Sequence, residues 1–143
     1  MERREALATA GILALASLGT SAFAAEHKHD HGGSGQQALI DATGQCVAKG
    51  EACLAHCLIL LGDGDKSMAD CAKAVNQMLA SCGALQKLAT QDSRLVGAMA
   101  KVALEACTEC QKNCKVHANK HAECKACMEA CTDCITQCKA VAA

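Results

Sequence analysis

The sequence predicts an all-α protein that folds as an antiparallel, up-down-up-down four-helix bundle with a cysteine-lined core. Its 143 residues include no Pro, Trp or Tyr and a single Phe, so no proline interrupts a helix. Alanine, leucine, lysine, glutamate and glutamine, which favour helices, fill much of the remainder. The thirteen cysteines recur largely at steps of three and four residues, which keep side chains on one face of a helix. Short connections between such segments favour antiparallel packing.

The net charge of −1, with acidic and basic residues interspersed, provides no basic surface of the kind that nucleic-acid binding requires. We therefore expect no nucleic-acid partner. The density of cysteines points to a disulfide scaffold or a metal site. Because their number is odd, a monomer with all possible disulfides would leave one thiol unpaired.

Residues 1–24 resemble an export signal. Arg3 and Arg4 precede an apolar run over residues 6–18, and Ala22-Phe-Ala24 matches a cleavage site. The run is shorter than the roughly 20 residues that span a bilayer, so we expect no membrane attachment after cleavage. The adjacent arginines also resemble a twin-arginine leader. We expect the protein to be exported, to a periplasm or another compartment outside the cytoplasm.

A polar segment rich in histidine and glycine follows at residues 25–35, and we interpret it as a flexible tail. Cleavage after Ala24 would make His27 the third residue of the mature chain. The free amine, the intervening backbone amides and the His27 imidazole could then hold Cu(II) in a square plane. A soluble spacer is the alternative interpretation. Residues 36–143 would form the bundle.

The first helix is expected over residues 36–61. Its inward stripe combines cysteine with leucine: Leu39, Cys46, Cys53, Cys57 and Leu60. Residues 62–65, with the sequence Gly-Asp-Gly-Asp, then end the helix and turn the chain. The other apolar residues are candidates for an oligomer surface or for the edge of the core: Val47, Leu54, Leu58 and Leu61.

The second helix is expected from about Ser67 to Ala89, with Ser67 and Asp70 as an acidic variant of a capping box. Its inward stripe mixes cysteine with apolar residues: Met68, Cys71, Val75, Met78, Cys82 and Leu85. Methionine at helical spacing is more often core filling than a metal ligand. On this ground we assign Met78 and Met99 to the core.

The third and fourth helices carry most of the cysteines. The third is expected over residues 94–118, with Asp92 and Ser93 offering an N-cap and Asn119 a C-cap. Its inward stripe is Val96, Met99, Ala103, Cys107, Cys110, Cys114 and His117. The fourth is expected over residues 120–141. Its inward stripe is His121, Cys124, Cys127, Cys131, Cys134, Cys138 and Val141.

Antiparallel packing brings the ends of the first and third helices to the starts of the second and fourth. This gathers imidazole and thioether groups at one end of the bundle: His56, Met68, His117 and His121. We expect that end to be a mouth where metal is loaded or held by auxiliary ligands. The opposite end is expected to be an apolar plug: Leu39, Ile40, Leu85, Leu88, Leu95, Val96, Met99 and Val141.

Sulfur occupies positions where a helical bundle normally places leucine and isoleucine. Neighbours on one helix face have Cβ atoms about 5–6 Å apart, close enough for their sulfurs to share a metal ion. Thiolate and thioether ligands select Cu(I), and each monovalent Cu(I) balances one thiolate that would otherwise be a costly buried charge. We predict storage of multiple Cu(I) ions by all thirteen cysteines: Cys46, Cys53, Cys57, Cys71, Cys82, Cys107, Cys110, Cys114, Cys124, Cys127, Cys131, Cys134 and Cys138.

Other classes of thiol protein remain as alternatives. A disulfide-stapled helical protein is one, although cysteines on the same helix face form strained bridges with each other. A protein for zinc or general metal detoxification is another, since Zn²⁺ binds four thiolates. The pairs with Cys-x-x-Cys spacing lack the βαβ context of a redox enzyme, and one iron–sulfur cluster needs far fewer thiols. No nucleophile with an orienting base is visible, so we expect no enzyme activity.

Four spaced sets of cysteines span residues 36–143: Cys46-x6-Cys53-x3-Cys57, Cys71-x10-Cys82, Cys107-x2-Cys110-x3-Cys114 and Cys124-x2-Cys127-x3-Cys131-x2-Cys134-x3-Cys138. This pattern resembles the bacterial copper storage proteins, and particularly their exported subgroup with a twin-arginine leader. The resemblance implies a four-helix bundle with Cu(I) stored along its axis and assembly as a homotetramer. It also implies copper buffering and supply to copper-requiring enzymes or copper carriers outside the cytoplasm.

Overall fold

The computed structural model describes residues 34–142 and confirms the four-helix bundle. The elements are α1 (Ser34–Gly62), the short 3-10 helix η1 (Lys66–Met68), α2 (Ala69–Thr90), α3 (Val96–His117) and α4 (Ala122–Val141). These described residues contain no strand. The predicted export signal, most of the predicted tail and His27 lie outside them.

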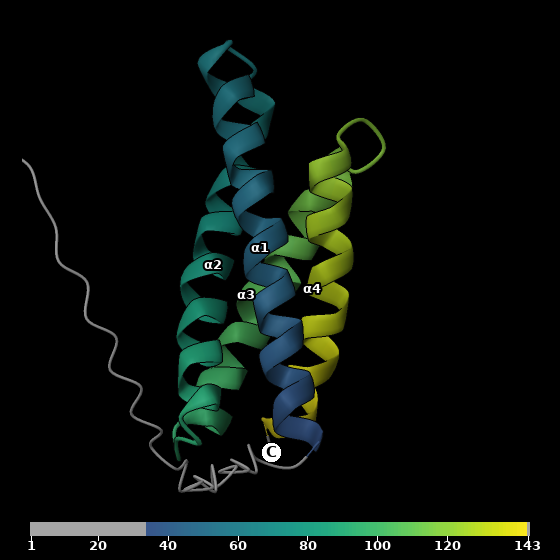
Figure 1. Cartoon of the computed structure of the whole chain (residues 1–143). Coiled ribbons are helices and arrows are strands. Elements are labelled where there is room, and N and C mark those ends of the chain that lie inside the picture. Colours follow the sequence, from purple (N-terminus) through teal and green to yellow (C-terminus); the bar gives the residue numbers. More distant parts are fainter. Residues whose placement is uncertain (1–33, 143) are drawn as a thin grey trace, which may run out of the picture.

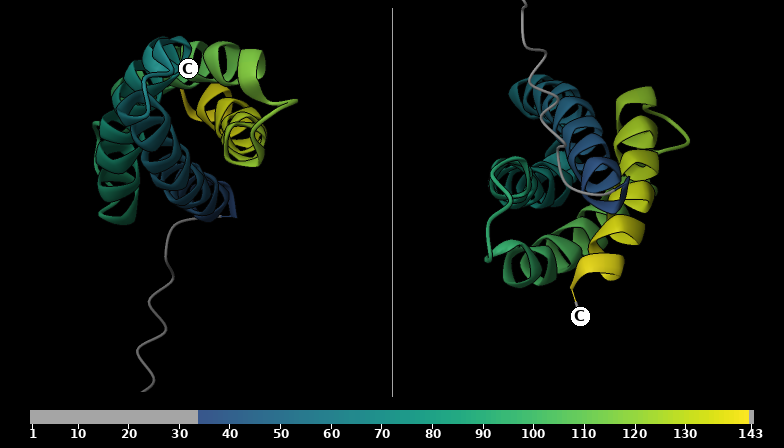
Figure 2. Two further views of the ribbon diagram at one scale, coloured as in Figure 1. Left: turned by 90° about the horizontal axis from the view of Figure 1, so that it is seen from above. Right: turned by 60° about the horizontal axis from the view of Figure 1, so that its bottom comes forward.

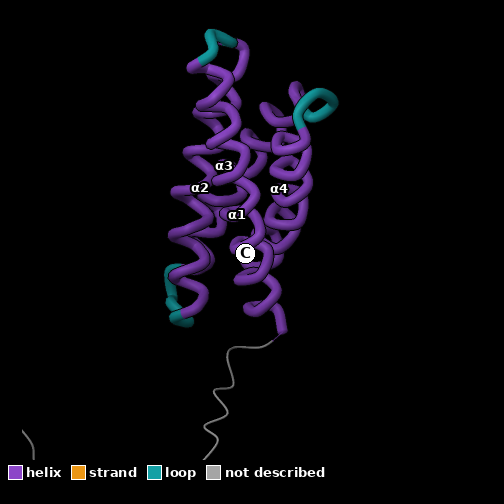
Figure 3. The backbone as a smooth tube through the Cα atoms, turned by 45° about the horizontal axis from the view of Figure 1, so that its top comes forward, coloured by secondary structure: helices purple, strands orange, loops and turns teal. Residues whose placement is uncertain are grey.

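The helices are arranged in a ring, as predicted for up-down-up-down topology. The backbone of α1 packs against α2 and α4, and that of α3 packs against the same two helices. The α1–α2 and α3–α4 turns lie at one end of the bundle and the α2–α3 turn at the other (Figures 1 and 3). The view from below shows the ring of four helices most clearly (Figure 2, right). Diagonal helices meet only through their side chains.

The turn between α1 and α2 shows how the local sequence sets the helix boundaries. Gly64 has a φ of 94°, which glycine adopts without the steric cost that a side chain would add. The predicted capping box of Ser67 and Asp70 is wrong, because Asp65 is the cap: its Oδ1 accepts from the Ser67 backbone N at 3.0 Å and from Ser67 Oγ at 2.6 Å. These bonds lower the pKa of the Asp65 carboxyl, with a smaller contribution from nearby histidines.

The other two turns also differ from the predicted caps. At the α2–α3 turn, α3 begins at Val96, and Ser93 Oγ accepts from the backbone N of Leu95 at 3.3 Å instead of capping the first helical turn. At the α3–α4 turn the C-cap of α3 is Ala118, so the assignment of Asn119 is wrong. Backbone hydrogen bonds from residues 120 and 121 to His117 O close this turn, which leaves the Asn119 side chain without a capping role.

The core consists mainly of sulfur, as the sequence predicts. All thirteen cysteines are fully buried. Leu39 and Leu85 are fully buried at the end of the bundle opposite the mouth, whereas Leu95, expected in the same plug, is 50% exposed. Thr43 is also fully buried, and its Oγ1 donates to Leu39 O at 2.7 Å, which satisfies the hydroxyl inside the core.

Helix α1 is the most apolar of the four. By length and composition alone, Gln36–Gly62 could cross a membrane, with a mean hydropathy of 1.2. In the structure its cysteine stripe packs into the bundle, while Leu58 and Ile59 on its outer side are exposed. Val47, Leu54 and Leu61 are half-buried against the core. Of the residues expected on an outer apolar face, only Leu58 is therefore fully on the surface.

Candidate metal centre

Every cysteine of the chain is a free thiol in the bundle interior. Four groups of sulfurs have all members within 4.8 Å of one another. The groups are Cys46, Cys82, Cys107 and Cys134; Cys53, Cys57, Cys71 and Cys124; Cys53, Cys114 and Cys127; and Cys110, Cys127 and Cys131. Each group joins at least two helices, so the packing of the bundle, more than any one helix, brings the ligands together.

The group nearest the mouth contains Cys53, Cys57, Cys71 and Cys124. It draws two thiols from α1 and one each from α2 and α4, and Cys53 Sγ donates to Cys124 Sγ at 3.8 Å. Burial raises the pKa of the Cys57 thiol to about 11, and the charge of Cys71 adds to this effect. A proton therefore stays on Cys57 at neutral pH until a cation replaces it.

The group nearest the plug contains Cys46, Cys82, Cys107 and Cys134, one from each helix. Cys82 and Cys107 have the shortest Sγ–Sγ distance, 3.3 Å, and Cys82 and Cys134 meet across the bundle at 3.7 Å. Two sulfurs bound to one ion through bonds of about 2.3 Å stand about 3.3 to 4.6 Å apart, depending on the bond angle. The thiols are thus already spaced as ligands of a shared ion.

The two middle groups connect the ends. Cys127 belongs to both of them, and Cys53 belongs to one of them and to the group at the mouth. Cys110 links α3 to α4 through Cys127 at 3.7 Å, and Cys114 links α3 to α2 through Cys71 at 3.7 Å. Cys131 lies 3.7 Å from Cys46 of the group nearest the plug, and Cys138, outside the four groups, lies 3.9 Å from Cys134. The sulfurs therefore form one continuous column.

Hydrogen bonds between thiols inside the column shift their pKa values in both directions. Bonds from Cys107 and Cys131 lower the pKa of Cys46 to about 6. Hydrogen bonding with Cys107 and Cys138 lowers the pKa of Cys134, while hydrogen bonding with Cys134 and burial raise the pKa of Cys138. Hydrogen bonding to the charged form stabilises that form. A few thiolates can thus exist inside the apolar bundle with neighbouring thiols as their donors.

The mouth brings together the histidines that the sequence predicts there. His56 Nε2 and His121 Nδ1 are 2.9 Å apart, and the ring centroids of His117 and His121 are 6.2 Å apart. Met68, in η1 at the same end, is fully buried. The sequence did not suggest Glu123, whose Oε2 lies 3.8 Å from His56 Nε2. Its position between His121 and Cys124 becomes informative only once α1 is placed beside α4.

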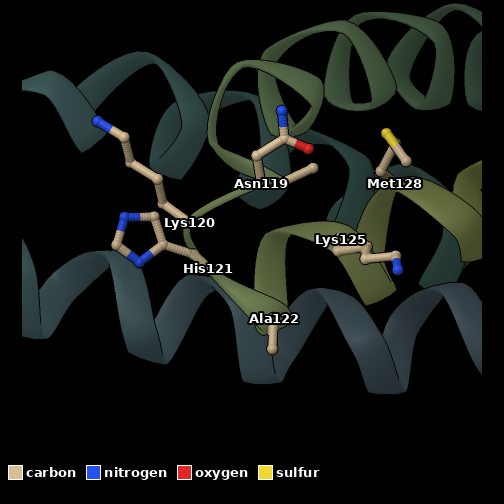
Figure 4. Close-up of a pocket in the computed structure, with 7 residues that line it drawn as sticks. Asn119, Lys120, His121, Ala122, Lys125 and Met128 are labelled. Carbon is tan, nitrogen blue, oxygen red and sulfur yellow. The ribbon is translucent and has the colours of Figure 1, made fainter.

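A surface pocket adjoins the mouth at the α3–α4 turn. Figure 4 shows its labelled lining: Asn119, Lys120, His121, Ala122, Lys125 and Met128. The His121 side chain lies on the α1 side of this turn, apart from Asn119 and Met128. Met128 is half-buried against the core, which agrees with its flanking position in the sequence.

The sequence analysis assigned one further sulfur, that of Met78, to core packing. Met78 is fully buried, and its Sδ accepts from Cys46 Sγ at 3.3 Å. A signal was present, because Met78 continues the spacing of Cys71 and Cys82 on the same helix face. Thr43 likewise occupies a position of the α1 stripe that sequence reasoning did not include.

A helical bundle whose interior is a continuous column of free thiols, grouped at metal-ligand spacing, is a cysteine-rich metal-binding protein. The family model described as "Csp: Copper storage protein" matches residues 33–143. The chain belongs to the copper storage protein family. A solved structure, the "Cu(I)-bound Copper Storage Protein BsCsp3", is 24% identical over 76% of this chain and 99% of its own, with a TM-score of 0.67. No curated protein matches this sequence.

Proposed function

We propose that this protein stores multiple Cu(I) ions on the thiolates of its column, buffers free copper and supplies it to copper-requiring enzymes or copper carriers. The continuity of the sulfur column carries the proposal, because ions can bind along its whole length. Thiolate ligands prefer Cu(I), and one positive charge per ion offsets one thiolate charge. This role is non-enzymatic.

Copper enters and leaves at the mouth. His56 and His121 lie in hydrogen-bond contact and are half-buried, so their nitrogens can be reached from solvent. Imidazole binds copper more weakly than a set of thiolates does in this redox state, since soft ligands suit Cu(I) best. An ion held there passes on to the adjacent group of Cys53, Cys57, Cys71 and Cys124.

Titration of the reduced protein with Cu(I) under anaerobic conditions tests storage. We expect several tightly bound ions per chain, with thiol reactivity lost in proportion to the copper added. A single bound ion, or thiols that stay reactive at saturation, would contradict storage. Zinc provides the comparison: Cys46, Cys82, Cys107 and Cys134 could hold one tetrahedral Zn²⁺. If zinc binds in larger number and resists displacement by Cu(I), zinc detoxification is the better description.

The export signal at residues 1–24 is the basis for a proposal about where the protein acts. We propose export by the twin-arginine route, which moves folded proteins and would protect the thiols from an oxidising compartment. Once residues 1–24 are removed, His27 could form the Cu(II) site described above. N-terminal sequencing of the secreted protein tests the cleavage position, and replacement of Arg3 and Arg4 by lysine tests the route.

We also propose a homotetramer, as the family resemblance implies. Leu58 and Ile59 on α1 are 57% and 64% exposed, and burying such side chains stabilises an interface. Light scattering of the wild type and of a Leu58→Lys, Ile59→Lys double variant tests this. A tetramer that becomes smaller in the variant supports the proposal, and a wild-type monomer refutes it.

A further inference from the structure

We propose that Met78 is a copper ligand, and that its thioether shares a Cu(I) ion with the thiolate of Cys46. This inference rests on the proposed storage of Cu(I). It adds a sulfur from outside the cysteine set and places a neutral ligand inside a column of anionic ones.

The sulfur of Cys46 is surrounded by one sulfur from each of the other three helices. Met78 Sδ of α2 lies at 3.3 Å, Cys131 Sγ of α4 at 3.7 Å and Cys107 Sγ of α3 at 4.0 Å. All four residues are fully buried. Each of the three distances is one that two sulfurs bound to the same ion through bonds of about 2.3 Å can have. The Met78 contact is the shortest of the three.

The register of α2 places this thioether in the ligand stripe. Cys71, Val75, Met78 and Cys82 follow one another at steps of four, three and four residues, and all are fully buried. Such steps keep the four side chains on one helix face. Met78 therefore occupies a position on the same helix face as the two thiols of α2, one turn from Cys82.

Helix α1 makes room for the longer side chain. Gly50 continues the spacing of Cys46, Cys53 and Cys57 but carries no side chain. A Cβ atom at residue 50 would lie 2.6 Å from Met78 Cε and 2.8 Å from a Leu79 methyl carbon. The space left by Gly50 thus accommodates the methyl group of Met78, while its sulfur faces Cys46.

The chemistry of the two facing sulfurs, Cys46 Sγ and Met78 Sδ, favours a cation between them. As a thiol, Cys46 donates its proton to Met78 Sδ. Once that proton is lost, two sulfurs with lone pairs face each other at 3.3 Å, and a soft cation between them is the group that satisfies both. Binding of Cu(I) between the two sulfurs displaces this proton, as metal binding to thiols generally does. A thioether adds no negative charge, so Cu(I) there leaves less excess charge than with thiolates alone.

Selenium labelling provides a direct test. A Met68→Leu, Met99→Leu, Met128→Leu variant of the mature bundle retains Met78 as its only methionine within residues 34–142. We would grow it with selenomethionine, load it with Cu(I) and record the selenium-edge X-ray absorption. A copper scatterer at bonding distance from selenium is the expected result. The matched control retains Met99 alone, by replacing Met68, Met78 and Met128, and should show no copper scatterer.

The outcomes separate this inference from the storage proposal. If the Met78 variant binds several Cu(I) ions but its selenium has no copper neighbour, Met78 is core filling and the inference is wrong while storage stands. If the folded variant and the wild type both bind no Cu(I), the storage proposal itself fails. If the variant does not fold, the wild type and the Met78→Leu variant, both labelled with selenomethionine, are compared instead. The inference then requires that Met78→Leu lose a selenium–copper contribution that the wild type shows. If Met99→Leu loses this contribution and Met78→Leu keeps it, the inference about Met78 is wrong.

Discussion

The two hairpins of the bundle have different interiors. The α1–α2 hairpin contributes five cysteines, and its other fully buried side chains include Leu39, Thr43, Val75, Met78 and Leu85. The α3–α4 hairpin contributes eight cysteines, and its only other buried residues are alanines: Ala100, Ala103 and Ala130. One hairpin therefore combines an apolar core with metal ligands, whereas the interior of the other is almost entirely thiol.

This difference shows how one bundle can both fold and store metal. Buried apolar surface stabilises the fold without any ligand, and α1–α2 supplies most of it. Thiols are small hydrophobes while they are protonated, so the α3–α4 interior is compatible with folding until its protons leave. We infer that α1–α2 dominates the stability of the metal-free protein and that α3–α4 dominates its capacity.

The largest expected effect is on stability, from Leu85→Ala in α2. Leu85 is fully buried, and truncating such a leucine costs about 2–5 kcal/mol through lost burial and a cavity. Urea unfolding of the reduced, metal-free protein measures this, with Leu95→Ala, at a 50% exposed position, as the matched control. A decrease in the free energy of unfolding below about 1 kcal/mol would contradict the proposal that α1–α2 dominates the stability of the metal-free protein.

The next effect concerns capacity, from Cys127→Ala in α4. Cys127 belongs to two of the four sulfur groups, so its loss should lower the number of Cu(I) ions bound while the helices are retained. Copper counting and circular dichroism on the same sample check both parts. Thr132→Ala, at an exposed position of the same helix, is the control. Unchanged capacity in Cys127→Ala would mean that α4 does not face the stored metal.

The pH dependence of stability distinguishes the contribution of buried thiols from that of buried apolar side chains, because apolar side chains do not titrate. The pKa of Cys57 is raised from 9.0 to about 11, so between these values the folded chain keeps a proton that the unfolded chain has lost. Stability therefore falls as pH rises through this window. Cys46, with a pKa lowered to about 6, contributes stability above its unfolded pKa of 9.0 that is lost as pH falls through about 6.

Anaerobic unfolding across this range, with and without bound Cu(I), provides the measurement. Metal replaces the thiol protons, so we expect the loaded protein to unfold with little pH dependence between about 9 and 11. An equal dependence in both forms would indicate that the buried thiols are not the groups that titrate.

The smallest effect is expected at the α1–α2 turn, from Asp65→Asn. Asp65 is exposed and accepts two hydrogen bonds from Ser67. Its lowered pKa means that the carboxylate stabilises this turn above its unfolded pKa, and that this contribution is lost as pH falls through the lower folded value. Thermal unfolding at neutral pH should show a small decrease for the variant, which disappears at low pH. Copper capacity should not change.

Much of the fold could be predicted from the sequence because the period of the cysteines is itself the helical period. The absence of proline favours uninterrupted helices, and the Gly-rich turn at residues 62–65 separates the first helix from the second. The caps were less predictable: Asp65 and Ser93 compete with their neighbours for the same backbone donors, and tertiary packing decides between them. Leu95 was placed in the plug by its apolar character, but it lies before the first turn of α3 and points outward.

The site shows the same division. The inward direction of the cysteines and the gathering of His56, His117 and His121 follow from periodicity and topology. The proximity of Met78 to Cys46 does not, because it depends on the missing side chain at Gly50, on a neighbouring helix. Glu123 beside His56 depends in the same way on how α1 and α4 pack. Contacts between helices carry information that a stripe on one helix does not.

The sharing of Cys53 and Cys127 between sulfur groups bears on how copper ions could move through the bundle. Three of the four groups share a sulfur with a neighbour, and the group nearest the plug is joined to them by Cys46 and Cys131 at 3.7 Å, so a bound ion could change one ligand at a time. Leu39 and Leu85 are fully buried at the far end, so under the proposed storage the last ion to arrive would be the first to depart. Release should then proceed in order of depth, with the Cys46 layer emptied after the Cys57 layer.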